Sequence, residues 1–364
     1  MKLKEITDFL EEIAPLHYQE TYDNSGLLVG DRESSITAAL ITLDCTEEVV
    51  EEAILKNCNL IIAHHPIIFG SLSKITGKNY VERVIIKAIK NNISIYAIHT
   101  NLDNVYNGVN SKIVEKLAIK NCKILRPSSK FIKQLSVYCP SSHSESLKKS
   151  LLECGAGEFR NYDNCSFSVS GKGTFRPKQG SNPFMGNINQ TETVNEEKLD
   201  FFYNLKDESN LLDCLFLNHP YEQVAYQIFS LDNVSSEIGS GMIGELENEI
   251  ETEKFLEIIK DKMQTNCIRH TKLVHKKIKK VAVCGGSGSF LIDDAKNLKA
   301  DIFISSDFKY HEFFDADGDI IIADIGHFES EQYTKELIYD LLREKFTKFA
   351  VQLSNVNTNP INYL

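Results

Sequence analysis

The sequence predicts an α/β fold in which a core domain in two parts is interrupted by an inserted α+β module. Short apolar runs alternate with helical patterns over residues 37–120, and the same rhythm returns over residues 279–346. Between them, residues 131–234 are rich in Gly, Asn, Ser and aromatic residues, which favours hairpins and an antiparallel sheet. A chain of 364 residues also exceeds what one hydrophobic core usually serves. We expect the three segments to be residues 1–127, 128–234 and 235–364.

The first core part begins with an amphipathic helix. Leu3, Ile6, Leu10 and Ile13 recur at helical intervals with acidic residues between them, which is not the pattern of a signal peptide. Strands and helices then alternate, with Thr46 as a helix cap. The expected strands are 37–44, 59–66 and 93–100, and the expected helices are 46–57 and 79–92. This βαβαβ order predicts a largely parallel sheet that is covered on both faces.

The second core part repeats this rhythm. Residues 279–307 have the pattern of a strand, a Gly-rich turn, a helix and a second strand, and residues 319–346 that of a strand and a long helix. In open α/β sheets, ligands bind beyond the carboxyl ends of the strands. We therefore expect the strand ends of both core parts to meet at the mouth of one sheet.

Composition and charge exclude several classes of protein. With 42% hydrophobic and 25% charged residues the chain is typical of globular proteins, and its formal net charge of −11 disfavours nucleic acid as a partner. The one basic cluster, residues 272–280, is either a solvated flank of the next strand or a nucleic-acid patch. No apolar stretch is long enough to span a membrane, and the nine scattered cysteines contain no CxxC pair. We expect a cytoplasmic protein with reduced thiols and no membrane association.

The ends of the predicted core strands carry side chains that can bind metal ions or substrate. A single histidine at a strand end is more often a structural residue than a ligand, but so many such residues at one edge favour a metal site. The residues at these ends are Asp44, His64, His65, His99, Asn101, Asp103, Asp307, Tyr310, His311, Asp324, His327 and Glu331.

His327 and Glu331 are spaced for one shared site. They are four residues apart, so a helix over "HFESE" places both on one face. Pro66 ends the strand after His64 and His65, so each of these imidazoles can meet a different ion. Three imidazoles and two carboxylates suit two ions that share a carboxylate or a water, which is an arrangement that serves hydrolysis. Ligation by N and O without Cys leaves Zn, Mn, Fe, Co and Ni open.

Two further motifs have two interpretations each. "CGGSGSFL", residues 284–291, is either an anion-binding loop or a tight turn, and it matches neither common phosphate-loop pattern. Asp307, Tyr310 and His311 are either groups that support the ligands or substrate, or a polar cap on the next helix.

Several segments together resemble the Nif-three-like family, also called GTP cyclohydrolase 1 type 2 and formerly a domain of unknown function 34. They include "ETYDNSGLLVG", "LIIAHHPIIF", "IYAIHTNLDNVYNGVN", "GGSGSFL", "SSDFKYHEFFDA" and "ADIGHFESEQ". The resemblance covers both core parts, and its motifs are highly specific. It implies a dinuclear metal centre whose ligands are His64, His65, Asp103, His327 and Glu331.

The middle segment resembles the PII/CutA-like module that longer bacterial members carry between the two core parts. "VYCPSSHSESLKKSLLECGAGEFRNYDNCSFSVSGKGTFRP" and "NHPYEQVAYQIF" carry this resemblance, which implies a ferredoxin-like α+β fold. Arg160 and Asn161 depart from it, since the module has a Gly before the Tyr. Such modules trimerise, so the resemblance implies a homohexamer built as a trimer of dimers.

Taken together, the residues and the resemblance predict a metal-dependent hydrolase with two divalent ions that activate a bridging water. We expect His99, Tyr310 and His311 to orient the substrate or move protons. The expected substrate is a small nucleotide-like or phosphorylated molecule, and the family name points to GTP. The alternative is a metal-binding regulatory hexamer whose inserted domain senses a ligand without turnover.

Overall fold

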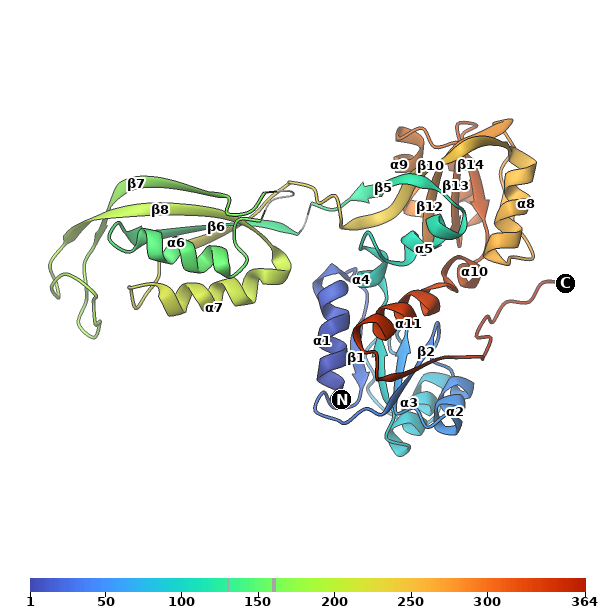
Figure 1. Cartoon of the computed structure of the whole chain (residues 1–364), viewed down its shortest axis with the longest axis horizontal. Helices are drawn as coiled ribbons and strands as arrows, with labels where there is room; N and C mark the ends of the chain where they lie inside the picture. The colour runs from blue at the N-terminus through green and yellow to red at the C-terminus, as the bar shows by residue number, and fades with distance from the viewer. Residues whose placement is uncertain (130, 159–161) are drawn as a thin grey trace. The chain divides into compact units, whose positions relative to one another are not determined.

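The computed structural model describes residues 1–129, 131–158 and 162–364 (Figure 1). The chain forms two compact units. The core unit comprises Met1–Pro127 and Ser236–Leu364, and the inserted unit comprises Ser128–Ser235. The departure at Arg160 and Asn161 lies outside the described residues.

The first sheet of the core unit is mostly parallel. β2, β3 and β4 are buried along their whole length, as expected for parallel strands that are covered on both faces. Only β1, at one edge, runs antiparallel to its neighbour. The strand order is β1 (Gly26–Val29), β4 (Ser94–Ala97), β3 (Leu60–Ala63), β2 (Ala38–Thr42) and β15 (Ala350–Leu353).

Helices cover both faces of this sheet. Val49 of α2 (Glu47–Leu55) and Val84 of α3 (Tyr80–Lys90) pack with Ile95 of β4 on one face. Tyr96, the next residue, points to the opposite face because side chains alternate along a strand. Its hydroxyl lies 3.5 Å from the carboxylate of Glu11 on α1 (Leu3–Ile13), so α1 covers that face. The predicted βαβαβ order and the amphipathic first helix are confirmed.

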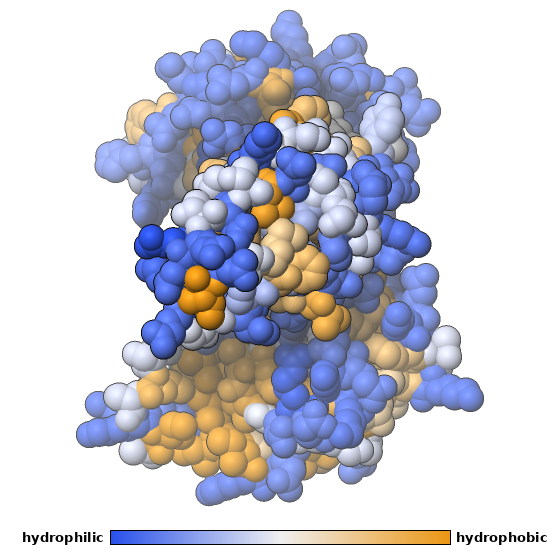
Figure 2. Space-filling view, turned by 90° about the vertical axis from the view of Figure 1, so that its left-hand side faces the viewer, coloured by the Kyte–Doolittle hydropathy of each residue, from blue (hydrophilic) through white to orange (hydrophobic). Residues whose placement is uncertain are grey.

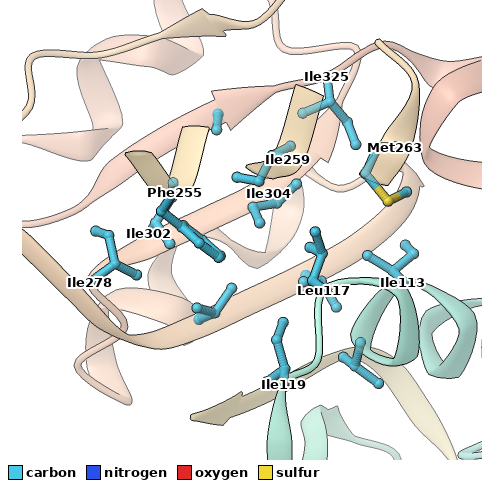
Figure 3. Close-up of a cluster of buried hydrophobic side chains, with 14 of the residues drawn as sticks. Ile113, Leu117, Ile119, Phe255, Ile259, Met263, Ile278, Ile302, Ile304 and Ile325 are labelled. Atoms are coloured by element: carbon cyan, nitrogen blue, oxygen red, sulfur yellow. The ribbon is translucent and has the colours of Figure 1, made fainter. Parts of the chain in front are cut away.

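A second sheet joins the two halves of the core unit. Its strand order is β11 (Arg269–His270), β14 (Ile321–Asp324), β13 (Ile302–Ser306), β12 (Lys277–Ser287), β10 (Gly239–Glu251) and β5 (Lys120–Pro127). β12, β13 and β14 are parallel, whereas β5, from the first half, pairs antiparallel with β10, from the second. α5 (Val109–Lys116) and α8 (Thr252–Met263) pack on one face through Ile113, Phe255 and Ile259 (Figure 3).

The expectation that both core parts share the mouth of one sheet is therefore wrong. The strands after residue 235 form their own sheet with β5, and only β15 returns to the first sheet, where it pairs parallel with β2. Hydrophobic periodicity identifies a strand but not its partner, because pairing depends on contacts between residues far apart in the sequence. The strand ends of two sheets, not one, supply the candidate ligands.

The inserted unit has the βαββαβ order and strand arrangement of a ferredoxin-like fold. Its sheet has the order β7 (Ser166–Phe175), β8 (Glu192–Asn204), β6 (Ile132–Pro140) and β9 (Tyr226–Ser230), and every pair is antiparallel. α6 (Ser144–Glu153) and α7 (Glu208–Asn218) bury their apolar side chains against Leu135, Leu199 and Phe201. The predicted α+β class is confirmed. Hydrophobic residues lie among hydrophilic ones on the surface of this unit (Figure 2).

The structure also bears on the basic cluster and on the expected lack of a membrane span. In the basic cluster, Lys279 donates hydrogen bonds from Nζ to the carbonyl oxygens of Leu246 and Glu247, so this lysine contributes to the packing of β12. Within the described part of the chain, no helix is both long and apolar enough to cross a membrane.

Candidate metal centre

The first two histidines of the site follow the end of β3. His64 is fully buried, and its Nδ1 atom lies 2.8 Å from the backbone carbonyl oxygen of Ile98. A carbonyl can only accept a hydrogen bond, so Nδ1 carries the proton and Nε2 keeps a free lone pair. This Nε2 is buried and has no hydrogen-bond partner among the residues that the structure describes.

His65 and His327 are each held between two carboxylates. His65 contacts Asp44 through Nδ1 at 2.7 Å and Glu331 Oε2 through Nε2 at 2.9 Å. His327, the first residue of α10 (His327–Glu331), contacts Asp307 through Nδ1 at 2.6 Å and the same Oε2 of Glu331 through Nε2 at 3.0 Å. The two Nε2 atoms lie 3.3 Å apart. The predicted helix over "HFESE" is confirmed, and it places both of its candidate ligands at one point.

Asp103 completes the cluster from the end of α4 (Thr100–Asp103). Its Oδ1 lies 3.6 Å from His64 Nε2, and Glu331 Oε1 lies 3.8 Å from the same nitrogen. Asp103 Oδ1 is buried and, within the described residues, has no hydrogen-bond partner. One oxygen of Glu331 thus faces His64, and the other faces His65 and His327.

Two triads in this cluster could each hold a metal ion. The ligand atoms of His65, His327 and Glu331 lie within 4.8 Å of one another, as do those of His64, Asp103 and Glu331. The two triads share only Glu331. The structure therefore brings together all five residues expected to bind metal, as two groups joined by one carboxylate. A third group of this size contains His64, His65 and His99.

Burial and charge shift the pKa values of these groups in opposite directions. Burial lowers the pKa of His64 to about 4. Burial also acts to lower the pKa values of His65 and His327, but the neighbouring carboxylates outweigh it and raise them to about 10 and about 11. Burial, with the charge of Glu331, raises the pKa of Asp103 well above its usual range. The imidazolium charges overcome burial at Glu331 and hold its pKa well below the usual range.

His99 lies beside the cluster with a carboxylate behind it. Its ring centroid is 5.3 Å from those of His64 and His65, and its Nδ1 is 2.8 Å from Asp23 Oδ1. Asp23 also accepts hydrogen bonds from the amide and hydroxyl of Thr100. Although burial opposes it, the bond to His99 lowers the pKa of Asp23. Sequence reasoning missed Asp23 as a site residue, although "ETYDNSGLLVG" contains it, because its role depends on the contact with His99 far along the chain.

The other residues expected to act on the substrate lie elsewhere. Tyr310 and His311 begin a 3₁₀ helix, η4 (Tyr310–Ala316), where their rings contact each other. Tyr310 is 73% exposed, and neither residue lines the cavity at the cluster. Asp307, from the same stretch, does reach the site, since it holds His327. Its φ of 59° is a left-handed conformation that Asp tolerates better than most residues.

The Gly-rich stretch makes room for Glu331. β12 continues through Ser287, so the glycines end a strand. The amide of Gly285 donates to Asn110 Oδ1 and that of Gly286 to Ser330 Oγ, which leaves neither amide for an anion and favours the tight-turn interpretation. Gly286 has a φ of 63°, and a Cβ at this position would lie 2.3 Å from Glu331 Oε1. A side chain here would displace the shared carboxylate.

The cluster opens into a cavity of about 630 Å³ that lies within the core unit. Residues near the C-terminus, from Thr358 to Ile361, form part of its lining, although no pattern in the sequence indicated this. The hydroxyl of Thr358 donates to Asp44 Oδ2 at 2.6 Å, so the tail supports the carboxylate that holds His65. A cavity of this size accommodates a small molecule next to the candidate ligands.

Comparisons with known proteins show the family of the chain. The sequence matches the Duf34/NIF3 (NGG1p interacting factor 3) family over residues 1–360. It is 36% identical over 368 residues to the "GTP cyclohydrolase 1 type 2 homolog" of Staphylococcus epidermidis, and the match covers 100% of both chains. The protein of the same name from Bacillus subtilis is 35% identical over 367 residues, covering 99% of this chain and 98% of that one. A solved structure of a Bacillus cereus protein related to NIF3 is 34% identical with a TM-score of 0.81, covering 100% of this chain and 99% of that one.

Proposed function

The chain belongs to the Duf34/NIF3 family, and from this premise we propose that it is a metal-dependent hydrolase with two divalent ions. The ions would be held by His64, His65, Asp103, His327 and Glu331, with Glu331 shared between them. The native metal would be Zn, Mn, Fe, Co or Ni, because these ions accept mixed nitrogen and oxygen ligands. The substrate class is a small nucleotide-like or phosphorylated molecule, GTP included.

The observation that carries this proposal is the pair of unpartnered atoms opposite the shared carboxylate. Buried polar atoms are almost always hydrogen-bonded, and each one left unpaired costs about 1–3 kcal/mol. His64 Nε2 and Asp103 Oδ1 are both buried and without partners among the described residues, and they lie 3.6 Å apart. A cation between them would satisfy both lone pairs. The donor set therefore fits a metal ion better than it fits a structural network.

Two ions held in this way would lower the pKa of a water between them and so supply a nucleophile near neutral pH. The chain's own residues have the other tasks. Asp44 and Asp307 fix the orientation of the His65 and His327 rings through their Nδ1 atoms. His99, backed by Asp23, lines the cavity and can accept or donate a proton at Nε2. Participation of Tyr310 and His311 stays a prediction, for which Tyr310→Phe and His311→Asn are the tests.

The assembly and location of the protein complete the proposal. We expect a cytoplasmic homohexamer, built as a trimer of dimers through the inserted unit. Light scattering on the full chain tests this, since a hexamer of a 41.2 kDa chain is readily distinguished from a dimer.

The test of function is turnover by the purified full chain. Hydrolysis of a panel of nucleotides and phosphoesters is measured with Mn, Zn or Ni and after metal removal, together with bound metal. We expect turnover that requires metal and is abolished in Asp103→Ala. Asp261→Ala, which removes an exposed carboxylate on α8, is the matched control and should leave turnover unchanged. Two bound ions without turnover on any substrate would overturn the hydrolase and support the regulatory alternative.

A further inference from the structure

Apart from its histidines, the described lining of the cavity has no cationic side chain. Among the described residues that line it, four are carboxylates and none is Lys or Arg. The carboxylates are Glu20, Asp44, Asp103 and Glu331. Sites that hold several phosphates usually surround them with Arg, Lys or free backbone amides. This cavity lacks the side chains, and the amides of Gly285 and Gly286 are already bonded to protein groups.

Two divalent ions would not reverse this balance. The four positive charges of the ions would equal the four negative charges of the lining carboxylates, so the loaded cavity would be close to neutral. An anion could still bind one ion directly. A phosphate beyond the reach of both ions would then meet carboxylates and no Lys or Arg among the described lining residues, and like-charge contacts oppose binding. The electrostatics thus favour a ligand with few negative charges.

The cavity instead offers aromatic surface. Tyr22, Phe69, Tyr80 and Phe290 line it, and each is between 52% and 67% exposed. Pockets that bind small molecules are lined mainly by hydrophobic and aromatic side chains, and a large exposed apolar patch often marks an interaction site. Phe69 is also tied to the site, since its ring lies 5.6 Å edge-on from that of His99. Such rings can stack on a planar heterocycle whatever its substituents, because every aromatic ring has a π-face.

We propose that the substrate is a planar aromatic molecule that carries at most one negatively charged group, such as a nucleoside or a nucleoside monophosphate, and that triphosphates are disfavoured. This inference rests on the proposed function, whose substrate class it narrows. The ring would stack on Phe69 or its aromatic neighbours, and the single anionic or polar group would point toward the candidate metal ligands.

The test is equilibrium binding measured by calorimetry. The full chain is first loaded with ions of a single metal, and the probes are guanosine, GMP and GTP. We expect guanosine or GMP to bind at least about tenfold more tightly than GTP at moderate ionic strength. Bound metal is measured after each titration, so that chelation by GTP is recognised and corrected. GTP that binds as tightly as GMP would overturn the inference, and so would the absence of binding by all three probes.

Variants separate the two parts of the inference. Phe69→Ala should weaken binding of all three probes by about tenfold, because it removes a stacking surface from each. Phe314→Ala, which changes an exposed aromatic residue outside the cavity, should leave binding of all three probes unchanged. Glu20→Gln keeps the acceptor for the Asn104 amide and removes one negative charge, so it should raise the affinity for GTP relative to guanosine. Equal effects of Glu20→Gln on both probes would contradict the charge argument.

This outcome is distinguishable from failure of the proposed function. If the chain holds two ions and hydrolyses a nucleotide but prefers triphosphates, the function stands and the inference falls. If the chain binds no metal ions, the proposed function falls whatever the probes show.

Discussion

The two ligand groups that share Glu331 differ in how their side chains are held. In the paired half, His65 and His327 each contact a carboxylate at Nδ1 and Glu331 at Nε2. In the unpaired half, His64 is fixed by a backbone carbonyl, and the facing atoms of His64 and Asp103 have no partner among the described residues. One half is stabilised by its own charges, whereas the other has buried polar atoms without a partner among the described residues.

The candidate metal centre therefore consists of two unlike sites. The carboxylates of the paired half orient the imidazole rings and make them more basic. The rings therefore retain protons that an ion must displace. Burial keeps His64 neutral, so that it is ready to bind an ion at neutral pH. The two halves should therefore respond differently to substitution and to pH.

The largest effect should come from the residue that both halves share. Glu331→Gln removes the negative charge that faces His64, His65 and His327, so we expect it to abolish binding of both ions. The loss in affinity should exceed the roughly hundredfold that removal of a supporting carboxylate causes. Metal content by mass spectrometry is the measurement. Glu336→Gln, an exposed glutamate on α11 (Thr334–Lys345), is the control, and two ions retained by Glu331→Gln would refute the shared ligand.

Substitution of one half should remove one ion. Asp103→Asn keeps the volume of the side chain but leaves the unpaired half without its carboxylate, while His65, His327 and Glu331 are untouched. We expect one bound ion per chain where the unmodified protein binds two. His327→Gln should remove the other ion and leave the unpaired half. If either variant lost both ions or neither, the two halves would not be separate sites.

A smaller effect should follow from loss of a supporting carboxylate. Asp307→Asn keeps a residue type that tolerates the left-handed conformation, but it weakens the contact to His327 Nδ1. We expect the ion in the paired half to bind about 10–100-fold more weakly and the other ion to be unaffected. Asp317→Asn is a close control, because Asp317 is also left-handed, with a φ of 49°, and belongs to the same stretch. Equal weakening in both variants would show that the cause is the backbone.

The smallest expected effect is the dependence of metal affinity on pH. The pKa values of His65 and His327 are raised to about 10 and about 11, so both rings are protonated at neutral pH until an ion displaces their protons. The affinity of the paired half should therefore rise with pH through the neutral range. Calorimetry of Asp103→Asn in buffers of different ionisation enthalpy should show release of about two protons per ion. The ion bound by His327→Gln should release fewer protons, because His64 is already neutral. Equal proton release by the two variants would show that the paired and unpaired halves do not differ in protonation.

Much of the fold and the five central residues could be predicted, because their signals are local. Thr46 caps α2 as expected, with its hydroxyl accepting a hydrogen bond from the Val49 amide at 3.3 Å. The family resemblance, which the comparisons confirm as to family, also pointed to these five residues as candidate ligands. Asp23 and Thr358 escaped prediction because they act through contacts with residues 76 and 314 positions away in the sequence. The pairing of strands into two sheets has the same non-local origin.

A crystal structure of the metal-loaded chain, with anomalous scattering recorded at the edge of the added metal, would show whether Glu331 joins two metal sites. Two ions that share Glu331 should give two peaks about 3.5–4 Å apart. One should lie against His65 and His327, the other against His64 and Asp103, and each should contact a different oxygen of Glu331. A single peak, or two peaks that do not share Glu331, would contradict this arrangement.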